Sequence, residues 1–206
     1  FTVEYANGKL MLLDQTALPA TERYIECENW QRVAKAISDL EVRGAPAIGV
    51  TAAFGLVLAV KASLATTHKE MLNELESVAE SLIATRPTAV NLAWAVQEVM
   101  EVARSSQTVE EMQQSVESTA QRLHAEDLAI CKAIGDAGAE LLAGAKNVIT
   151  HCNAGGLATV GYGTALGVIR SAHRENPDLH VWVDETRPVL QGARLTSYEL
   201  HRDGID

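Results

Sequence analysis

The sequence places one thiol where a side chain can do chemistry. Cys152 follows the short β-branched run 147–150 and precedes a glycine-rich turn. Open parallel sheets bind ligands at the carboxyl ends of their strands. A thiol just before a helix N-terminus can act there as a nucleophile, an acid or a base. A small apolar side chain that packs the strand end is the competing interpretation, and residue order alone leaves both open.

The neighbours of Cys152 allow similar pairs of interpretations. His151 is either a general base or a hydrogen-bonded structural histidine. Nearby glycines would let backbone N–H groups approach a phosphate at a helix start, although close packing of a helix on a strand explains them as well. These glycines are Gly155, Gly156, Gly161 and Gly163. They do not match G-x-G-x-x-G, which disfavours a dinucleotide cofactor.

A second polar stretch, Asp184–Pro188, follows the next predicted strand, so we expect it to face the same cleft. Arg187 and Gln191 lie four residues apart, and one helix face would present both to a ligand. Arg187 as a structural partner of Glu185 is the alternative.

Two arginines stand next to helix boundaries earlier in the chain. Arg43 precedes Gly44, Ala45 and Pro46, where free backbone N–H groups and a guanidinium would together hold an anion. Arg86 precedes another proline and allows the same interpretation. A surface arginine ahead of an ordinary helix is the alternative for both.

Hydrophobic periodicity predicts the elements that must position these residues. Residues 1–26 alternate as strands do, with a turn signal at Asn7-Gly8, and 24–27 is a third short strand. Helices are then predicted after Asn29 and over 47–62, 69–84, 90–104 and 109–142. The last of these helices is long enough to bridge two domains. We therefore predict a strand and helical domain over 1–120 and a second domain over 121–206.

The second domain is predicted to open a parallel α/β sheet. Strands over 147–150 and 179–183 alternate with helices over 158–173 and from about Pro188 to Arg202. A two-stranded parallel sheet with exposed edges is unstable alone. We therefore expect further sequence or another chain to continue it.

Composition excludes several classes of protein. The chain has 206 residues and a net charge of -10, which disfavours nucleic acid as a partner. Its three cysteines are too few and too scattered for a disulfide framework, which indicates a reducing, cytoplasmic compartment, and no Cys/His cluster predicts a metal.

The apolar stretch 45–60 looks too short and too mixed to span a membrane. No signal peptide opens the chain, and the first residue, Phe1, is not Met, so we expect the natural start to lie upstream.

Four ordered blocks of sequence resemble the methylthioribose-1-phosphate isomerases, a family shared with regulatory subunits of translation initiation factor 2B. The blocks are Val42–Gly49, Arg86–Leu92, Thr150–Gly155 with Gly161–Ala165, and Asp184–Pro188 with Leu190–Leu195. The resemblance covers nearly the whole chain. It implies a small N-terminal domain, a Rossmann-like second domain, and a cytoplasmic homodimer that needs no cofactor.

The implied activity is the interconversion of 5-methylthioribose 1-phosphate and 5-methylthioribulose 1-phosphate in methionine salvage. By the resemblance, Cys152 is catalytic, and a small phosphorylated sugar is held by Arg43, Gly44, Ala45, Arg86 and Gln191. The partner carboxylate of the family belongs to sequence beyond Asp206. We therefore expect the C-terminal part of the protein to be missing here and residues 1–206 alone to be inactive.

Two related functions remain as alternatives. Ribose-1,5-bisphosphate isomerases share the superfamily, but the stretch after Cys152 looks more like the methylthioribose branch. A non-enzymatic regulatory subunit like those of initiation factor 2B is the other alternative. The thiol and the Arg43 block favour the enzyme, since an assembly subunit has no need for a thiol at a strand end.

Overall fold

An antiparallel sheet opens the chain in the computed structural model, which describes residues 1–206. The sheet consists of β1 (Val3–Ala6), β2 (Lys9–Leu13) and β3 (Tyr24–Cys27), in the order β1-β2-β3. Asn7 and Gly8 form the β1–β2 turn with positive φ angles of 54° and 77°, as an Asn-Gly hairpin turn requires.

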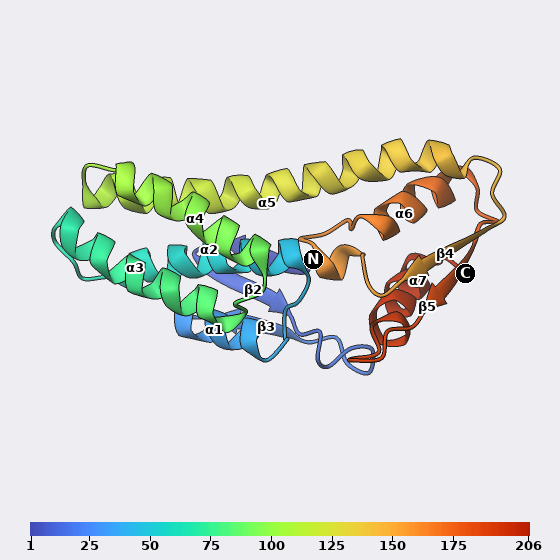
Figure 1. Ribbon diagram of the computed structural model, residues 1–206, viewed down its shortest axis with the longest axis horizontal. Coiled ribbons are helices and arrows are strands. Elements are labelled where there is room, and N and C mark those ends of the chain that lie inside the picture. Colours follow the sequence, from blue (N-terminus) through green and yellow to red (C-terminus); the bar gives the residue numbers. More distant parts are fainter.

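Five helices complete the N-terminal body (Figure 1). They are α1 (Trp30–Ser38), α2 (Ala45–Ala62), α3 (His68–Thr85), α4 (Val90–Ser105) and α5 (Val109–Ala139). The side chains of Asn29, Thr67 and Thr108 accept hydrogen bonds from backbone N–H groups at the starts of α1, α3 and α5, as helix caps do. Apolar faces of these helices meet in one cluster of 34 buried residues.

Helix α2 lies at the centre of this cluster, where it packs against α1, α3, α4 and α5. By length and composition alone, this 18-residue helix could cross a membrane, so the expectation that the stretch is too short and too mixed is wrong. The helix is 72% buried inside the protein, which is typical of a core helix.

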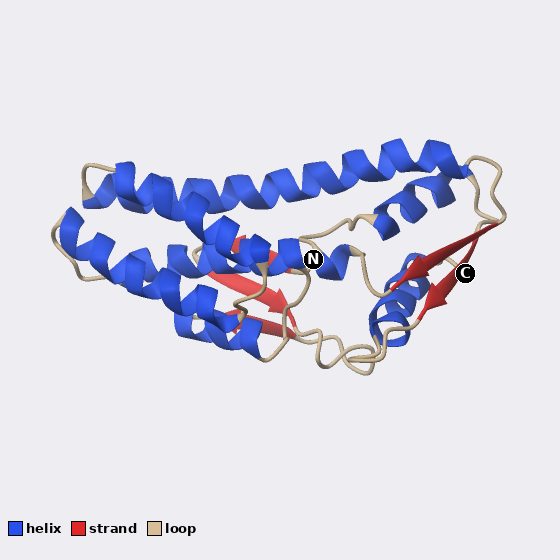
Figure 2. Cartoon of the chain, viewed as in Figure 1, coloured by secondary structure: helices blue, strands red, loops and turns tan.

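The second body is built on a parallel pair of strands, β4 (Asn147–His151) and β5 (His180–Asp184), shown at the right of Figure 2. Helices α6 (Ala165–Glu175) and α7 (Ser197–Asp203) accompany them, and a π-helical turn, Gly192–Thr196, leads into α7. The N–H of Val181 donates to the carbonyl of Asp206 over 2.7 Å, so the last residue lies along β5. The α/β fold class is therefore confirmed.

Two predicted helix starts in this body are wrong. The helix expected over 158–173 begins only at Ala165, because 156–158 is a 3₁₀ turn and the glycines up to Gly163 form a tight loop. The helix expected from Pro188 begins at Gln191, after a turn that covers 187–190.

Helix α5 runs along both bodies (Figure 1). Met112, Val116 and Ala120 belong to the core of the first body. Farther along, α5 packs on α6 so closely that a Cβ atom at Gly135 would lie 2.8 Å from the carbonyl oxygen of Gly167. The domain boundary at residue 120 stays a prediction.

Candidate functional site

Residues from both bodies line a cavity of about 370 Å³. Leu40, Arg43, Gly44 and Arg86 come from the first body. The second body contributes Cys152, Asn153, Ala158, Pro188, Val189 and Gln191. Five of the six residues singled out by sequence thus face one space. Ala45, the sixth, is the exposed first residue of α2 and is not among the lining residues.

Arg43 and Arg86 give the cavity a positive wall. Arg43 stands just before α2, and Arg86 caps the end of α3. Burial lowers the pKa of the Arg43 guanidinium, the charges of Arg194 and Arg86 act in the same direction, and Cys152 opposes them. The guanidinium stays charged at neutral pH, because arginine titrates far above that range. An anion in the cavity would relieve the repulsion among these side chains.

Gly44 brings the two bodies into contact at the cavity wall. Its φ of 97° suits glycine, and a Cβ atom there would collide with the backbone of Ala158. No larger residue would fit between the start of α2 and the loop after Cys152.

Cys152 takes an unusual backbone conformation at the end of β4. Its φ is 60°, in the left-handed region that costs a non-glycine residue on the order of 1 kcal/mol or more. The half-buried sulfur hydrogen-bonds with Thr186 Oγ1 over 3.7 Å, and the same hydroxyl contacts Gln191 Oε1. The ends of β4 and β5 therefore meet, as the sequence predicts.

Other residues predicted near this edge have different surroundings. Arg187 lies in the turn before Gln191, so the two do not share a helix face. Glu185 accepts hydrogen bonds from the N–H groups of Gly192 and Ala193 at 2.8 and 3.0 Å, so its partners are backbone groups and not Arg187. The exposed His151 has its Nδ1 3.8 Å from Asp184 Oδ2.

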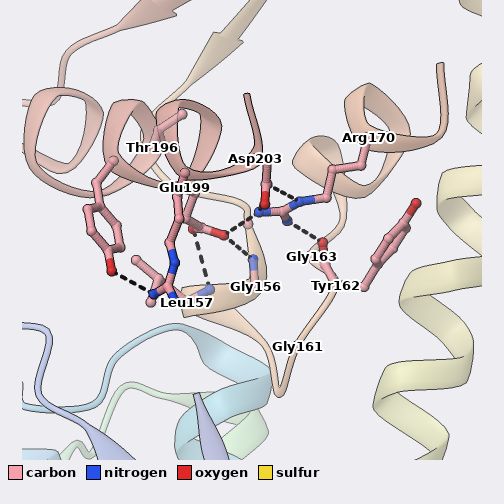
Figure 3. Close-up of polar contacts among 12 residues, drawn as sticks. Gly156, Leu157, Gly161, Tyr162, Gly163, Arg170, Thr196, Glu199 and Asp203 are labelled. Carbon is pink, nitrogen blue, oxygen red and sulfur yellow. Dashed lines mark hydrogen bonds and ion pairs between the residues drawn. The ribbon is translucent and has the colours of Figure 1, made fainter. Parts of the chain in front are cut away.

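The glycine-rich loop surrounds an internal carboxylate (Figure 3). Glu199 of α7 is 6% exposed and accepts from the N–H groups of Gly156 and Leu157 at 2.7 and 3.4 Å. A Cβ atom at Gly155 would collide with this carboxylate. The N–H of Gly156, one of the groups predicted to approach a phosphate, is thus already bound, and Gly155 serves close packing.

Sequence reasoning missed Glu199 and its partner Arg170. Arg170 NH2 lies 3.0 Å from Glu199 Oε2 and 2.6 Å from Asp203 Oδ2. Burial lowers the pKa of Arg170, but the two carboxylates outweigh it and the pKa is raised. Arg170 and Glu199 are 29 residues apart on separate helices, so only their opposite charges hinted at a pair.

A larger hollow of about 600 Å³ lies between α1, α2 and α3. Glu74 is the one charged residue among those that line it. We place the candidate site in the smaller cavity, because two arginines and a thiol converge there.

Comparison with known proteins gives concordant results. Residues 41–206 match the initiation factor 2 subunit family. Methylthioribose-1-phosphate isomerase of Geobacter metallireducens is 50% identical over 206 residues, which are 99% of this chain and 60% of that protein. The Herpetosiphon aurantiacus protein of the same name is 51% identical over 197 residues, which are 95% of this chain and 56% of that protein.

Solved structures extend the comparison. The 5-methylthioribose 1-phosphate isomerase of Pyrococcus horikoshii superposes with a TM-score of 0.92 at 40% identity, over all of this chain and 58% of that one. The translation initiation factor eIF-2B subunit delta from A. fulgidus gives 0.91 at 42%, over all of this chain and 60% of that one.

This chain spans about 60% of the length of the first curated relatives it matches. The family match begins before Arg43 and runs through the last residue, so it includes every residue that lines the cavity except Leu40. The chain belongs to the initiation factor 2 subunit family.

Proposed function

We propose that this chain is the larger part of an isomerase that converts 5-methylthioribose 1-phosphate to 5-methylthioribulose 1-phosphate. The observation that carries the proposal is the convergence of Arg43, Arg86 and Cys152 on one cavity. Relatives that are about 50% identical in sequence and are named methylthioribose-1-phosphate isomerase support the substrate class.

The two arginines suit the phosphate of such a substrate. Guanidinium groups donate paired hydrogen bonds to phosphate oxygens. Arg43 and Arg86 come from different helix boundaries of the first body. A phosphate between them would be fixed in position and in orientation.

The thiol suits the chemistry of the sugar. A phosphate on the anomeric oxygen prevents the ring from opening as a free hemiacetal does, so ring opening needs assistance before hydrogen moves from C2 to C1. Among the residues that line the cavity, Cys152 has the one side chain of a type that serves as a nucleophile, an acid or a base. We assign it that exchange and assign Gln191 to a sugar hydroxyl. The second acid–base group belongs to sequence beyond Asp206.

The finer expectations belong to the same proposal. We infer a place in methionine salvage, a homodimer and a cytoplasmic location, with no cofactor in the reaction. The convergence of a positively charged, anion-binding wall and a single thiol supports a phosphorylated sugar over a nucleic acid or a lipid.

Turnover by the natural polypeptide that contains this chain tests the proposal. We expect the ketose to form from 5-methylthioribose 1-phosphate at least tenfold faster, in kcat/KM, than from ribose 1,5-bisphosphate. Cys152→Ala should abolish the reaction, and Arg43→Ala should raise KM at least tenfold. Glu140→Gln, an exposed change in the 3₁₀ turn that follows α5, is the matched control. Full turnover by Cys152→Ala would remove the thiol from the mechanism, and the same assay on residues 1–206 tests their expected inactivity.

A non-catalytic assembly subunit is the second candidate. The likeness to the A. fulgidus structure, which is named as a translation initiation factor subunit, favours it. This function predicts no turnover of either sugar phosphate and no effect of Cys152→Ala on assembly. Sedimentation of the wild type and the Cys152 variant, beside the turnover assay, separates the two candidates.

A further inference from the structure

We propose that Glu199 is a positioning residue, which orients the Asn153 carboxamide and holds Cys152 in its left-handed conformation. Glu199 is not among the residues that line the cavity, so it acts through the residues it binds. The inference deepens the proposed function and rests on it for its effect on turnover, whereas its effect on the thiol is independent of the reaction.

The carboxylate of Glu199 is the fixed point of the network (Figure 3). Arg170 and the N–H groups of Gly156 and Leu157 all donate to it. The side chain is 6% exposed, and Arg170 compensates its charge. An ionised carboxylate offers only acceptors, so every neighbour must present a donor to it.

This requirement determines which way the Asn153 amide points. Asn153 Nδ2 donates to Glu199 Oε1 over 2.9 Å and to Thr196 Oγ1 over 3.1 Å. Both amide hydrogens are used, so the carbonyl oxygen is the part of the amide left to accept from a ligand in the cavity. A reversed amide would set its oxygen against the carboxylate.

The network then reaches the backbone of Cys152. Because Thr196 Oγ1 accepts from Asn153, its own hydrogen is free to donate, and it donates to the Cys152 carbonyl over 2.5 Å. That bond fixes the peptide unit that follows the left-handed residue. The sulfur is thereby held half-buried beside Thr186.

Asp203 offers a matched contrast to Glu199. It pairs with the same Arg170, over 2.6 Å, from the exposed end of α7. Its hydrogen bond and ion pair are both with Arg170, and neither involves Asn153 or the glycine turn. A change at Asp203 weakens its own ion pair with Arg170. It leaves in place the hydrogen bonds that lead from Glu199 through Asn153 and Thr196 to the Cys152 carbonyl.

The test is alkylation of Cys152 by iodoacetamide in the natural polypeptide that contains this chain, resolved by peptide mass spectrometry. Burial and the contact with Thr186 slow the reaction in the wild type, so release of the sulfur should speed it. We expect Glu199→Gln to raise the rate constant at least fivefold and Asp203→Asn to leave it within twofold. The buried Cys27 and Cys131 report unfolding if they become labelled.

A second pair of variants keeps the test independent of the charge. Thr196→Val removes one hydroxyl and retains the shape of the side chain, and Thr196→Ser restores the hydroxyl. We expect the valine variant to match Glu199→Gln and the serine variant to stay within twofold of wild type. If Cys27 and Cys131 react in Glu199→Gln, the Thr196 pair decides.

Turnover gives the complementary measurement. Glu199→Gln and Thr196→Val should lower kcat at least tenfold with KM changed less than threefold, because Arg43 and Arg86 belong to the other body. Rates of Cys152 alkylation within twofold of wild type in folded Glu199→Gln and Thr196→Val would overturn the proposal. A wild type without isomerase activity would instead remove the proposed function, and the alkylation rates would still decide the role of Glu199.

Discussion

The two bodies of this chain are held together by different forces. The first body supplies all but one of the 34 residues of the main apolar cluster, the exception being Val160, whereas the largest cluster confined to the second body has five. The second body relies on the Arg170–Glu199 ion pair, on Glu185 at the start of the π-helical turn, and on glycines in close contact. It also leaves Ile149 and Trp182 68% and 57% exposed on its sheet.

This difference means that one body mainly supplies stability and the other mainly fixes the geometry of the site. Apolar burial is strong but non-directional, so it holds the helices without specifying the position of one atom. Hydrogen bonds to a charged group are directional, and they surround the turn that carries Cys152. The first body therefore serves as a scaffold, and the second sets the positions of the residues at the cavity.

The contrast predicts its largest effect in the first body. Phe54 is 2% exposed, and its ring stacks on Tyr5 with centroids 4.7 Å apart. Phe54→Ala should lower the free energy of unfolding by about 3–5 kcal/mol, since it leaves a cavity in the main core. Urea denaturation measures the loss, and Leu64→Ala, at a residue 93% exposed, is the control. A loss below about 1 kcal/mol would show that this core is not the main source of stability.

A glycine in the second body should give the next largest effect. A Cβ atom at Gly156 would collide with the carbonyl oxygen of Gly161. Gly156→Ala should cost about 1–3 kcal/mol through this overpacking. Amide exchange should show the loss around β4 and α6 rather than in α2. Gly144→Ala meets open space at a φ of 76°, so it separates backbone strain from collision; equal losses in the two variants would contradict the close-packing explanation.

The junction between the bodies should respond more weakly. Arg194 NH2 donates to the carbonyls of Gln15, Thr16 and Leu18 at 3.3, 3.1 and 2.9 Å. Arg194→Lys keeps the charge and loses the fork of donors, so we expect a loss of about 1–2 kcal/mol in thermal unfolding. Arg187→Lys, at an exposed turn residue, should change nothing. Equal stability of the two variants would mean that the junction does not depend on the guanidinium.

The smallest effect concerns Asp127, where α5 meets the loop after the glycine turn. Burial raises the pKa of this carboxyl, while the N–H of Val160, 2.9 Å from Oδ2, and the charge of His124 oppose the shift. Because the pKa is raised, the stability that this carboxyl contributes below its ordinary pKa of 3.8 is lost as pH rises through the folded pKa. Asp127→Asn should therefore gain less than about 1 kcal/mol at pH 7 and nothing near pH 3.5. Melting curves at the two pH values check this, and a gain of the same size at both would exclude ionisation as the cause.

The sequence was informative wherever the pattern was local. Apolar spacing predicted α1, α3, α4 and α5 because each of them buries one face, whereas α2 was predicted from a nearly continuous apolar run, and the capping signal at Asn29 marked a real helix start. The strand-end rule placed Cys152 opposite Thr186, because parallel strands share one edge. Motif resemblance singled out Arg43 and Arg86, and the structure brings both to that cavity. Their roles stay predictions.

The rest depended on contacts between distant residues. The pattern around Gly155 fits a phosphate loop, but the anion it surrounds is Glu199, 44 positions along the chain. A glutamate in an ordinary helical stretch gives no signal of burial, since burial is decided by Arg170 and the turn that pack on it. The late start of α6 has the same origin, because Gly163 packs against Gly155 and the chain turns there before the helix begins.

Helix α5 fixes how the second body is rotated about the helix axis relative to the first body. Ala120 packs in the first body and Cys131 is buried where α5 meets the second, eleven residues or about three turns apart, so both lie on nearly one side of the helix. One residue inserted between Leu123 and Cys131 would rotate the far half of the helix by about 100° relative to the near half. Arg43 and Cys152 would then no longer face the same space, whereas a four-residue insertion would nearly restore the angle and shift the far half by about 6 Å along the axis. The shape of the cavity thus depends on the number of residues in α5, although no residue of α5 lines it.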